Sequence, residues 1–453
     1  MRAPLVVVAL CASSCSFITA TGFEECASDS ECGPASACVR RYCLPLPAAC
    51  SRTEGAFDAG DRIPLGALVP LTADGTVSER ELIRLEAMQL ALREANSKGG
   101  LGHRQFALFT CNVLDTDEAV KAKTEWLIAN LEVAALFSSG SSRTRWMAVD
   151  DVRVDAGTFI MSANSTSTSL ISLHQTYGNV WRVAPPDTQQ ARVIRSLVSE
   201  SVDAGAAVSI IYEKSDYGDG LELYLQDELT RAGFPVALVD YQPPLDAARA
   251  TTAAGRLGVG PGATVMVGFP GDVALLATAA ATVHGLTPGA GHRWFLSDAA
   301  KDPAILTAAT KPLLEGAVGT APAQSKGLAF LNFRDSFQNT FGADPTAYSF
   351  TAHSYDAMWL TLAATAWASR EGGAVTGPRM GEGMSHLASG PSEQLLGANW
   401  LDLSLKLSGG TSVDVEGSSG PLVFDVEAGA PASQYEVWTV TDGGIGTKTF
   451  RSP

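Results

Sequence analysis

Two clusters of small polar residues mark a place where the chain could bind an anion. Residues 138–142 are Ser-Ser-Gly-Ser-Ser, and residues 162–166 are Ser-Ala-Asn-Ser-Thr. Each cluster follows a short apolar run, 133–137 or 158–161, that is typical of a buried parallel strand. Ligands of open α/β sheets bind beyond such strand ends, where backbone N–H groups and a helix N-terminus receive a carboxylate or phosphate. The alternative is that these residues only form turns and N-caps.

The elements around the clusters alternate between strand and helix. Ser78 and Glu81 form a capping-box pattern, and apolar residues follow at helical spacing at 83, 87, 90, 91 and 95. Asp115 and Asp187 are expected to cap two further helices. Strands are expected at 63–71, 106–113, 180–183, 207–212, 236–241, 264–269, 292–296 and 316–320. The alternation predicts parallel sheets covered by helices, and its restart at Asp187 predicts a second lobe facing the first across a cleft.

The N-terminus reads as an export signal. Arg2 precedes a short apolar run, 5–11, and then small residues that lead to Cys15. This pattern resembles a bacterial lipoprotein signal, in which the cysteine is lipidated after cleavage, so residues 1–14 are expected to be removed. Ala12 stands where such signals usually carry Leu, and ordinary secretion with nearby cleavage is the alternative.

Six further cysteines fit three disulfides in an oxidising compartment. Cys26, Cys32, Cys38 and Cys43 form a tight cluster in a segment too small for a core of its own, so residues 15–61 are expected to be a disulfide-stapled module and linker. Cys50 and Cys111 would then tie the module to the main body. The spacing is not CxxC and no histidine lies nearby, which argues against zinc.

Composition and motifs argue against several classes of function. The 453-residue chain has a net charge of −16, which disfavours nucleic acid or an anionic membrane surface as the main partner. The six histidines are scattered, and the chain has no GxSxG elbow and no GxxxxGK[ST] phosphate loop. No catalytic residue, metal ligand or cofactor site is therefore expected, and the protein is not expected to be an enzyme.

From about residue 63 onward the chain resembles type-1 periplasmic binding proteins of the leucine/isoleucine/valine-binding family. Four local matches in order carry the resemblance, namely residues 93–100, the two polar clusters, residues 215–220 and residues 354–357. The resemblance implies an α/β fold of two Rossmann-like lobes joined by three crossovers around a ligand cleft. Lobe 1 would comprise 62–185 and 322–418, and lobe 2 would comprise 186–321 and 419–453.

The resemblance also implies where a free amino acid would bind. Its carboxylate would take donors at Ser141, Asn164 and Thr166, and its ammonium would take Asp298 with Tyr217 lining the cleft. Burial of either charged end without such partners costs several kcal/mol. The alternatives are that Asp298 caps the next helix and that Tyr217 packs on a turn.

Two positions depart from the family pattern at the mouth of the cleft. Arg80 stands where an aromatic residue often covers the ligand from lobe 1, and Phe269 or Pro270 stands at the lobe 2 aromatic position. Arg80 suggests a ligand with an additional anionic group, such as an acidic amino acid or a dicarboxylate. The alternative is a solvated arginine near a helix start.

These features predict an exported solute-binding protein that is periplasmic or anchored by its N-terminal lipid. It would capture a small amino-acid-like ligand by hinge closure and deliver it to an ABC permease. The alternative is a sensing or surface-scaffold lipoprotein with the same fold and no transport role, which the cysteine-rich module favours.

Overall fold

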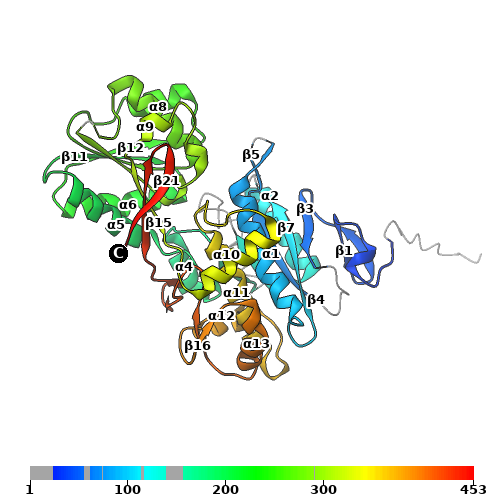
Figure 1. Cartoon of the computed structure of the whole chain (residues 1–453). Coiled ribbons are helices and arrows are strands. Elements are labelled where there is room, and N and C mark those ends of the chain that lie inside the picture. Colours follow the sequence, from blue (N-terminus) through cyan, green and yellow to red (C-terminus); the bar gives the residue numbers. More distant parts are fainter. Residues whose placement is uncertain (1–23, 56–61, 74, 114–116, 139–156, 290) are drawn as a thin grey trace, which may run out of the picture.

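The computed structural model describes residues 24–55, 62–73, 75–113, 117–138, 157–289 and 291–453. These residues form two α/β lobes and a small N-terminal module (Figure 1). The expected α/β fold with largely parallel sheets is confirmed. The exact residue limits of the lobes stay a prediction. Cys15, Asp115, Ser141 and the segment between the two polar clusters up to residue 156 lie outside the described residues.

Lobe 1 is built on a six-stranded sheet in which all neighbouring strands are parallel except β3 and β7. Its order is β10-β9-β8-β4-β7-β3, with bounds β10 (Val180–Arg182), β9 (Phe159–Ser162), β8 (Ala135–Ser138), β4 (Arg62–Val69), β7 (Gln105–Asn112) and β3 (Cys50–Glu54). The central strands are buried along nearly their whole length, as their apolar runs predict. Strands β8 and β9 end side by side at Ser138 and Ser162, so the first residues of the two polar clusters lie at the same edge of the sheet.

Helices from two distant parts of the chain cover this sheet. The early ones are α1 (Glu79–Ser97), α2 (Asp117–Leu131) and α4 (Ser169–Tyr177), and the late ones are α10 (Leu328–Phe341), α11 (Thr351–Ala368), α12 (Gly377–Ser385) and α13 (Trp400–Ser408). Buried residues of α1, α10 and α11 share one hydrophobic core with strands of this sheet. The late segment therefore returns to lobe 1 after the chain has built lobe 2.

Helix α1 forms as its sequence predicts. The Ser78 hydroxyl accepts the N–H of Glu81 at 3.5 Å, which is the expected cap. The expected apolar face is buried at Ile83, Ala87, Leu90, Ala91 and Ala95. This face fixes the rotation of the helix, and it leaves Arg80 in the first turn facing the junction of the lobes.

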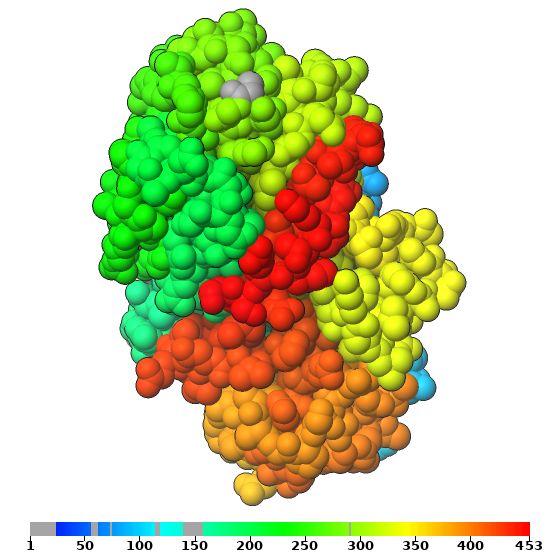
Figure 2. Space-filling view, turned by 60° about the vertical axis from the view of Figure 1, so that its left-hand side comes forward, coloured from blue at the N-terminus to red at the C-terminus, as the bar shows by residue number. Residues whose placement is uncertain are grey.

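Lobe 2 is built on a seven-stranded sheet. Its order is β12 (Val236–Tyr241), β11 (Ala207–Glu213), β13 (Gly262–Val267), β14 (His292–Leu296), β15 (Val318–Pro322), β20 (Tyr435–Thr441) and β21 (Gly444–Arg451). The first five strands are parallel, whereas β20 and β21 are antiparallel additions. The C-terminal β20–β21 hairpin lies across the face shown in Figure 2, between the upper lobe and the segments below it. The last part of the chain thus completes the lobe 2 sheet.

The helices of lobe 2 are α5 (Asp187–Ser201), α6 (Asp216–Arg231), α7 (Ala247–Ala254), α8 (Pro270–His284) and α9 (Lys311–Leu314). Asp187 was expected to cap α5, and this expectation is wrong. Pro186 is the N-cap residue, and Asp187 is the first helical residue. The carboxylate is therefore available for contacts at the lobe junction.

Short elements complete the described structure. The 3-10 helices are η1 (Asp29–Glu31), η2 (Asp298–Ala300), η3 (Pro303–Ile305), η4 (Arg370–Gly372) and η5 (Gly397–Asn399). The short strand pairs are β5 (Thr72–Ala73) with β6 (Thr76–Val77), β16 (Ser392–Gln394) with β17 (Asp414–Glu416), and β18 (Phe424–Asp425) with β19 (Ala430–Pro431). Among the described helices, none is long and apolar enough to cross a membrane.

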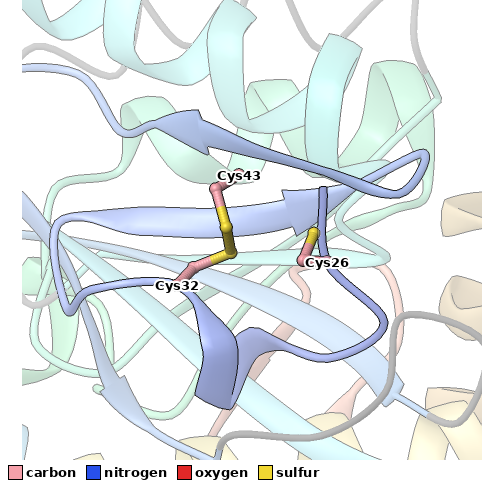
Figure 3. A group of neighbouring side chains, drawn as sticks. All are labelled: Cys26, Cys32 and Cys43. Carbon is pink, nitrogen blue, oxygen red and sulfur yellow. A yellow bond between two sulfur atoms is a disulfide. The ribbon is translucent and has the colours of Figure 1, made fainter. Parts of the chain in front are cut away.

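The N-terminal module is a hairpin of β1 (Ser36–Val39) and β2 (Tyr42–Pro45) held by two disulfides. These join Cys26 to Cys38 and Cys32 to Cys43, as Figure 3 shows in part. The sulfurs of Cys26, Cys32 and Cys43 lie within 4.8 Å of one another, but each is bonded in a disulfide, so none is a free thiolate ligand for a metal.

The module is docked on lobe 1. A third disulfide joins Cys50 to Cys111 and so links β3 to β7, which agrees with the pairing suggested by the sequence. Buried residues of the module, such as Val39, share a core with Phe109 of the sheet. An ion pair between Arg62 and buried Asp29 adds a polar link. The module therefore covers the edge of the lobe 1 sheet and is part of the folded body.

Candidate functional site

The first half of the candidate site follows β9. Asn164 and Thr166 are buried there, in a turn where the Ser162 hydroxyl accepts the N–H of Ser165 at 3.0 Å. The Thr166 carbonyl accepts the N–H of Asp187 at 2.9 Å, which joins this turn to the start of α5. Lobe 1 therefore presents hydroxyl and amide groups at the lobe junction, and these are the groups a buried carboxylate requires.

The second half lies beyond two strands of lobe 2. Tyr217, in the first turn of α6, donates its phenol O–H to the Asp298 carboxylate at 2.7 Å. Both side chains are buried. Burial raises the pKa of Asp298, and the hydrogen bonds from Tyr217 and Gln190 oppose that shift. Asp298 begins η2, but Ser297 is its N-cap residue, so the carboxylate is oriented mainly by Tyr217.

Asp187 brings a second carboxylate to the same region. The side chain is fully buried, and neither carboxylate oxygen has a hydrogen-bond partner at normal distance among the described residues. Burial raises the pKa of Asp187 to about 7, and repulsion from the charge of Asp298 adds to this increase. The nearby Thr166 hydroxyl and the charge of Arg182 both act to lower the pKa. Two neighbouring buried acids, one of which raises the pKa of the other, are a favourable place for a cation.

Arg182 and Tyr435 complete this buried cluster. Arg182 donates Nη1 to the Ser167 carbonyl at 2.6 Å, while its Nε and Nη2 have no partner among the described residues. Burial lowers the pKa of Arg182 to about 10, and attraction to Asp187 opposes that shift. The Tyr435 phenol is buried too, and both acids and Arg182 act on it electrostatically. The cluster therefore contains two acids, one guanidinium and unused hydrogen-bonding capacity.

Arg80 and Phe269 meet at the edge of the cluster, from opposite lobes. The Phe269 ring lies 5.7 Å from the Tyr217 ring, centroid to centroid. The Arg80 guanidinium carbon lies 5.4 Å from the centroid of the Phe269 ring, on the ring's face. Arg80 also pairs with Asp302, 3.4 Å from Nη1 to Oδ2. This arginine is thus held between the lobes and is not a freely solvated surface residue.

Most of the residues proposed from the sequence thus lie at one junction. Thr166 is joined to Asp187, the charge of Asp298 raises the pKa of Asp187, and Asp298 accepts a hydrogen bond from Tyr217. Ser141 lies outside the described residues. Sequence reasoning missed Asp187, Arg182, Gln190 and Tyr435 as site residues. A signal was present for Arg182, because a charged residue inside the apolar run 180–184 needs a buried partner.

A separate groove of about 640 Å³ lies between the C-terminal hairpin and lobe 1. Lys301, Phe330 and Phe450 are among its lining residues. None of Thr166, Tyr217 or Asp298 lines it. The groove opens on the side where the hairpin lies beside the segment around α10 in Figure 2. It is therefore distinct from the candidate ligand site.

Two α/β lobes with a buried polar cluster at their junction define the class of two-lobed ligand-binding proteins. Residues 83–443 match the family model described as the receptor family ligand binding region, and the chain belongs to that family. One relative is the chemotactic signal transduction system substrate-binding protein BasB of Halobacterium salinarum, 22% identical over 399 residues, covering 86% of this chain and 90% of the relative. Leu/Ile/Val-binding protein homolog 7 of Brucella abortus is 24% identical, over 42% of this chain and 48% of its own length.

Solved structures share the fold. A leucine-binding protein LivK from Thermotoga maritima superposes with a TM-score of 0.68 and 17% identity, covering 86% of this chain and 99% of the other. The branched-chain amino acid transporter substrate-binding protein LivJ from Streptococcus pneumoniae, in complex with isoleucine, gives 0.67 at 17% identity, covering 86% and 100%. The relationship to leucine/isoleucine/valine-binding proteins that the sequence suggests is confirmed.

Proposed function

We propose that the chain is an extracytoplasmic solute-binding protein that holds a small α-amino acid between its lobes by hinge closure. The observation that carries the proposal is the buried Tyr217–Asp298 hydrogen bond of 2.7 Å, together with Asp187, which lies close enough to Asp298 to feel its charge and is bonded to Thr166 of the lobe 1 turn. One lobe offers donors and the other offers an oriented carboxylate. This separation of charge preference suits a zwitterion, because each end of the ligand needs the opposite partner once water is excluded.

The charge of the cluster supports a ligand ammonium. Asp187 and Asp298 carry two negative charges when ionised, and Arg182 supplies one positive charge. The cluster is therefore one positive charge short of neutrality, and an ammonium group would supply it. Asp187 joins Asp298 in this role in the proposal, because the two carboxyl groups already interact with each other.

The other end of the ligand would be its carboxylate, bound by Asn164, Thr166 and Ser141. Phe269 would cover the ligand side chain from lobe 2, since its ring packs beside Tyr217. The suggestion that Arg80 selects ligands with an additional anionic group stays a prediction. Glu81 and Asp302 already surround that guanidinium and would compete with an anionic ligand.

In a transport role, the protein would deliver its ligand to an ABC permease, and a lipid on Cys15 would anchor it in the periplasmic space. Solved structures with this fold include proteins described as ABC transporter substrate-binding proteins, which favours transport. Sensing is the second candidate, and the similarity to a protein described as part of a chemotactic signal transduction system favours it. Ligand uptake in proteoliposomes with candidate permeases would separate the two roles.

A thermal-shift screen of the mature protein tests the proposal, because a ligand that binds only the folded state raises the melting temperature. The compounds are L-leucine, L-isoleucine, L-glutamate, succinate, acetamide and glucose. We expect a rise with at least one α-amino acid, lost in Asp298→Asn and in Thr166→Val. Asp402→Asn is the matched control, because Asp402 is an exposed aspartate on α13. A rise only with succinate or acetamide would contradict the role given to Asp298, and no rise with any compound would contradict amino-acid binding.

A further inference from the structure

Arg80 makes a direct contact between the two lobes. It projects from the first turn of α1 in lobe 1, and its side chain is only 16% exposed. Its partner Asp302, whose side chain is 9% exposed, belongs to the lobe 2 segment between η2 and η3. The Phe269 ring of lobe 2 lies under the same guanidinium. The Arg80 guanidinium of lobe 1 thus contacts both a carboxylate and an aromatic ring of lobe 2.

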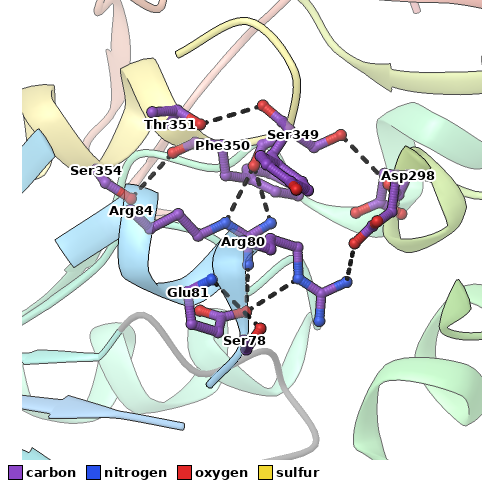
Figure 4. A network of polar contacts seen from close by, with 11 residues as sticks. Ser78, Arg80, Glu81, Arg84, Asp298, Ser349, Phe350, Thr351 and Ser354 are labelled. Carbon is purple, nitrogen blue, oxygen red and sulfur yellow. Dashed lines mark hydrogen bonds and ion pairs between the residues drawn. The ribbon is translucent and has the colours of Figure 1, made fainter. Parts of the chain in front are cut away.

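Lobe 1 holds Arg80 ready for this contact. Its Nε donates to Glu81 Oε1 at 3.1 Å, and Arg84 Nη1 donates to the same oxygen at 2.8 Å. Arg84 also donates Nε and Nη2 to the Ser349 carbonyl, at 3.0 and 2.8 Å. Figure 4 shows this network running from Ser78 and Glu81 to the segment at Ser349. The guanidinium is therefore oriented by contacts within its own lobe.

Lobe 2 holds the partner equally firmly. Asp302 Oδ1 accepts the N–H of Ala304 at 2.8 Å, which leaves Oδ2 for Arg80. The adjacent Lys301 forms a buried ion pair with Glu436 of β20, 2.6 Å from Nζ to Oε2. The segment that starts at the ligand-site residue Asp298 is therefore anchored to the C-terminal hairpin. Both partners of the ion pair are thus oriented by contacts within their own lobes.

We propose that Arg80, Asp302 and Phe269 form an interlobe latch that sets the opening equilibrium of the site independently of ligand. This inference rests on the proposed hinge-closing function. Arg80 lies on lobe 1, whereas Asp302 and Phe269 lie on lobe 2. Opening of the lobes would separate them, so the contact would raise the population of the closed, binding-competent form. In this role Arg80 does not touch the ligand; it holds the two lobes together through its contact with Asp302 and is a positioning residue.

The latch and an anion-selecting Arg80 make opposite predictions. If Arg80 acts as a latch, its loss lowers the affinity for every ligand by the same factor, because that factor reflects the closing equilibrium of the lobes. If Arg80 binds an anionic ligand group, its loss lowers the affinity for L-glutamate or succinate and leaves the affinity for L-leucine unchanged. In addition, if Arg80 acts as a latch, the effect of Arg80→Ala becomes smaller when Asp302 is already Asn, because only the contact with Phe269 is left to lose, whereas the effect of a direct ligand contact would stay the same.

The experiment measures closure with and without ligand. Small-angle scattering of ligand-free wild type, Arg80→Ala, Asp302→Asn and the double variant reports the open fraction, and calorimetry with L-leucine and L-glutamate reports affinity. Arg93→Ala is the control, since Arg93 lies on the same helix and pairs with Glu54 within lobe 1. We expect both single variants to shift the ligand-free protein toward the open form and to weaken binding roughly fivefold, as for a partly buried ion pair. The loss in the double variant should be smaller than the sum of the two single losses, because both single variants break the same ion pair.

Unchanged scattering of the ligand-free Arg80→Ala and Asp302→Asn variants would overturn the latch, as would additive losses in the double variant. If Arg80→Ala does not fold, the nearly isosteric Asp302→Asn decides alone. If neither amino acid binds wild type, the proposed ligand class fails, but the ligand-free scattering still supports or rejects the latch. The two failures are therefore distinguishable.

Discussion

The pH dependence of stability tests the buried acid pair directly. Burial and the neighbouring Asp298 raise the pKa of Asp187 from 3.8 to about 7 in the folded protein. Between these two values the unfolded chain has released its proton and the folded protein has retained it. Stability is therefore highest below pH 3.8 as far as this group is concerned, falls as pH rises, and levels off above about 7. The shift corresponds to a loss of roughly 4 kcal/mol as an upper limit.

The assay is urea unfolding of ligand-free wild type and Asp187→Asn at several pH values between 4 and 8. The readout is the difference in free energy of unfolding between the two proteins as a function of pH, because Asn also removes the charge beside Arg182 and so changes the absolute stability. Asp356, whose pKa burial raises to about 6, contributes equally to both proteins and cancels. We expect wild type to lose up to about 4 kcal/mol relative to the variant across this range.

The reasoning would be refuted by a difference between wild type and Asp187→Asn that stays constant with pH. Such a result would mean that Asp187 ionises at its ordinary pKa, and hence that it is hydrated or closely paired in the folded protein. The proposed second acid of the ligand site would then have no basis. Asp402→Asn serves as the control, since removing an exposed carboxylate should leave the pH profile parallel to that of wild type.

Three further predictions concern proton release on ligand binding, the hydrogen bonds from the backbone at Ser418 and Ser419 to Asp356, and the disulfide that joins the module to lobe 1. An amino-acid ammonium beside Asp187 should lower its pKa and release a proton at pH 7, giving a binding enthalpy that varies with buffer in calorimetry. Asp356→Ala should cost about 2–4 kcal/mol in urea unfolding and speed hydrogen exchange at Ser418, because buried N–H groups lose their acceptor. Replacing both Cys50 and Cys111 by Ala should cost about 4 kcal/mol of unfolding free energy, since their disulfide closes a loop with a sequence separation of 61.

The elements that sequence predicts well are those with a local cause. The cap at Ser78 and the apolar stripe of α1 depend on residues within one helix, and the structure has both. The buried strands are short apolar runs between polar turns, so β8 and β9 lie within a residue or two of the expected limits. The position of Asp298 was predictable for the same reason, because a strand end is visible as the end of an apolar run.

The parts that sequence did not predict depend on contacts between distant segments. Asp187 looks like an N-cap from its neighbours alone, and only the arrival of Asp298, more than a hundred residues later, gives it a second acid to interact with. For the cysteine module, the Cys50–Cys111 link to lobe 1 was predictable, whereas its noncovalent docking was not. Its cysteines predicted disulfides, but the buried Asp29 that pairs with Arg62 is an ordinary acidic residue in the sequence.

The distribution of charge explains why closure and binding would be coupled in this protein. Asp298 and Asp302 lie on one short lobe 2 segment that Lys301 ties to the C-terminal hairpin. The first acid faces Tyr217 and the ligand site, and the second faces Arg80 of lobe 1. A ligand ammonium that draws Asp298 toward lobe 1 therefore carries Asp302 toward Arg80 at the same time. Binding energy and latch energy add in the closed state, so weakening either one should lower the apparent affinity for the same ligand.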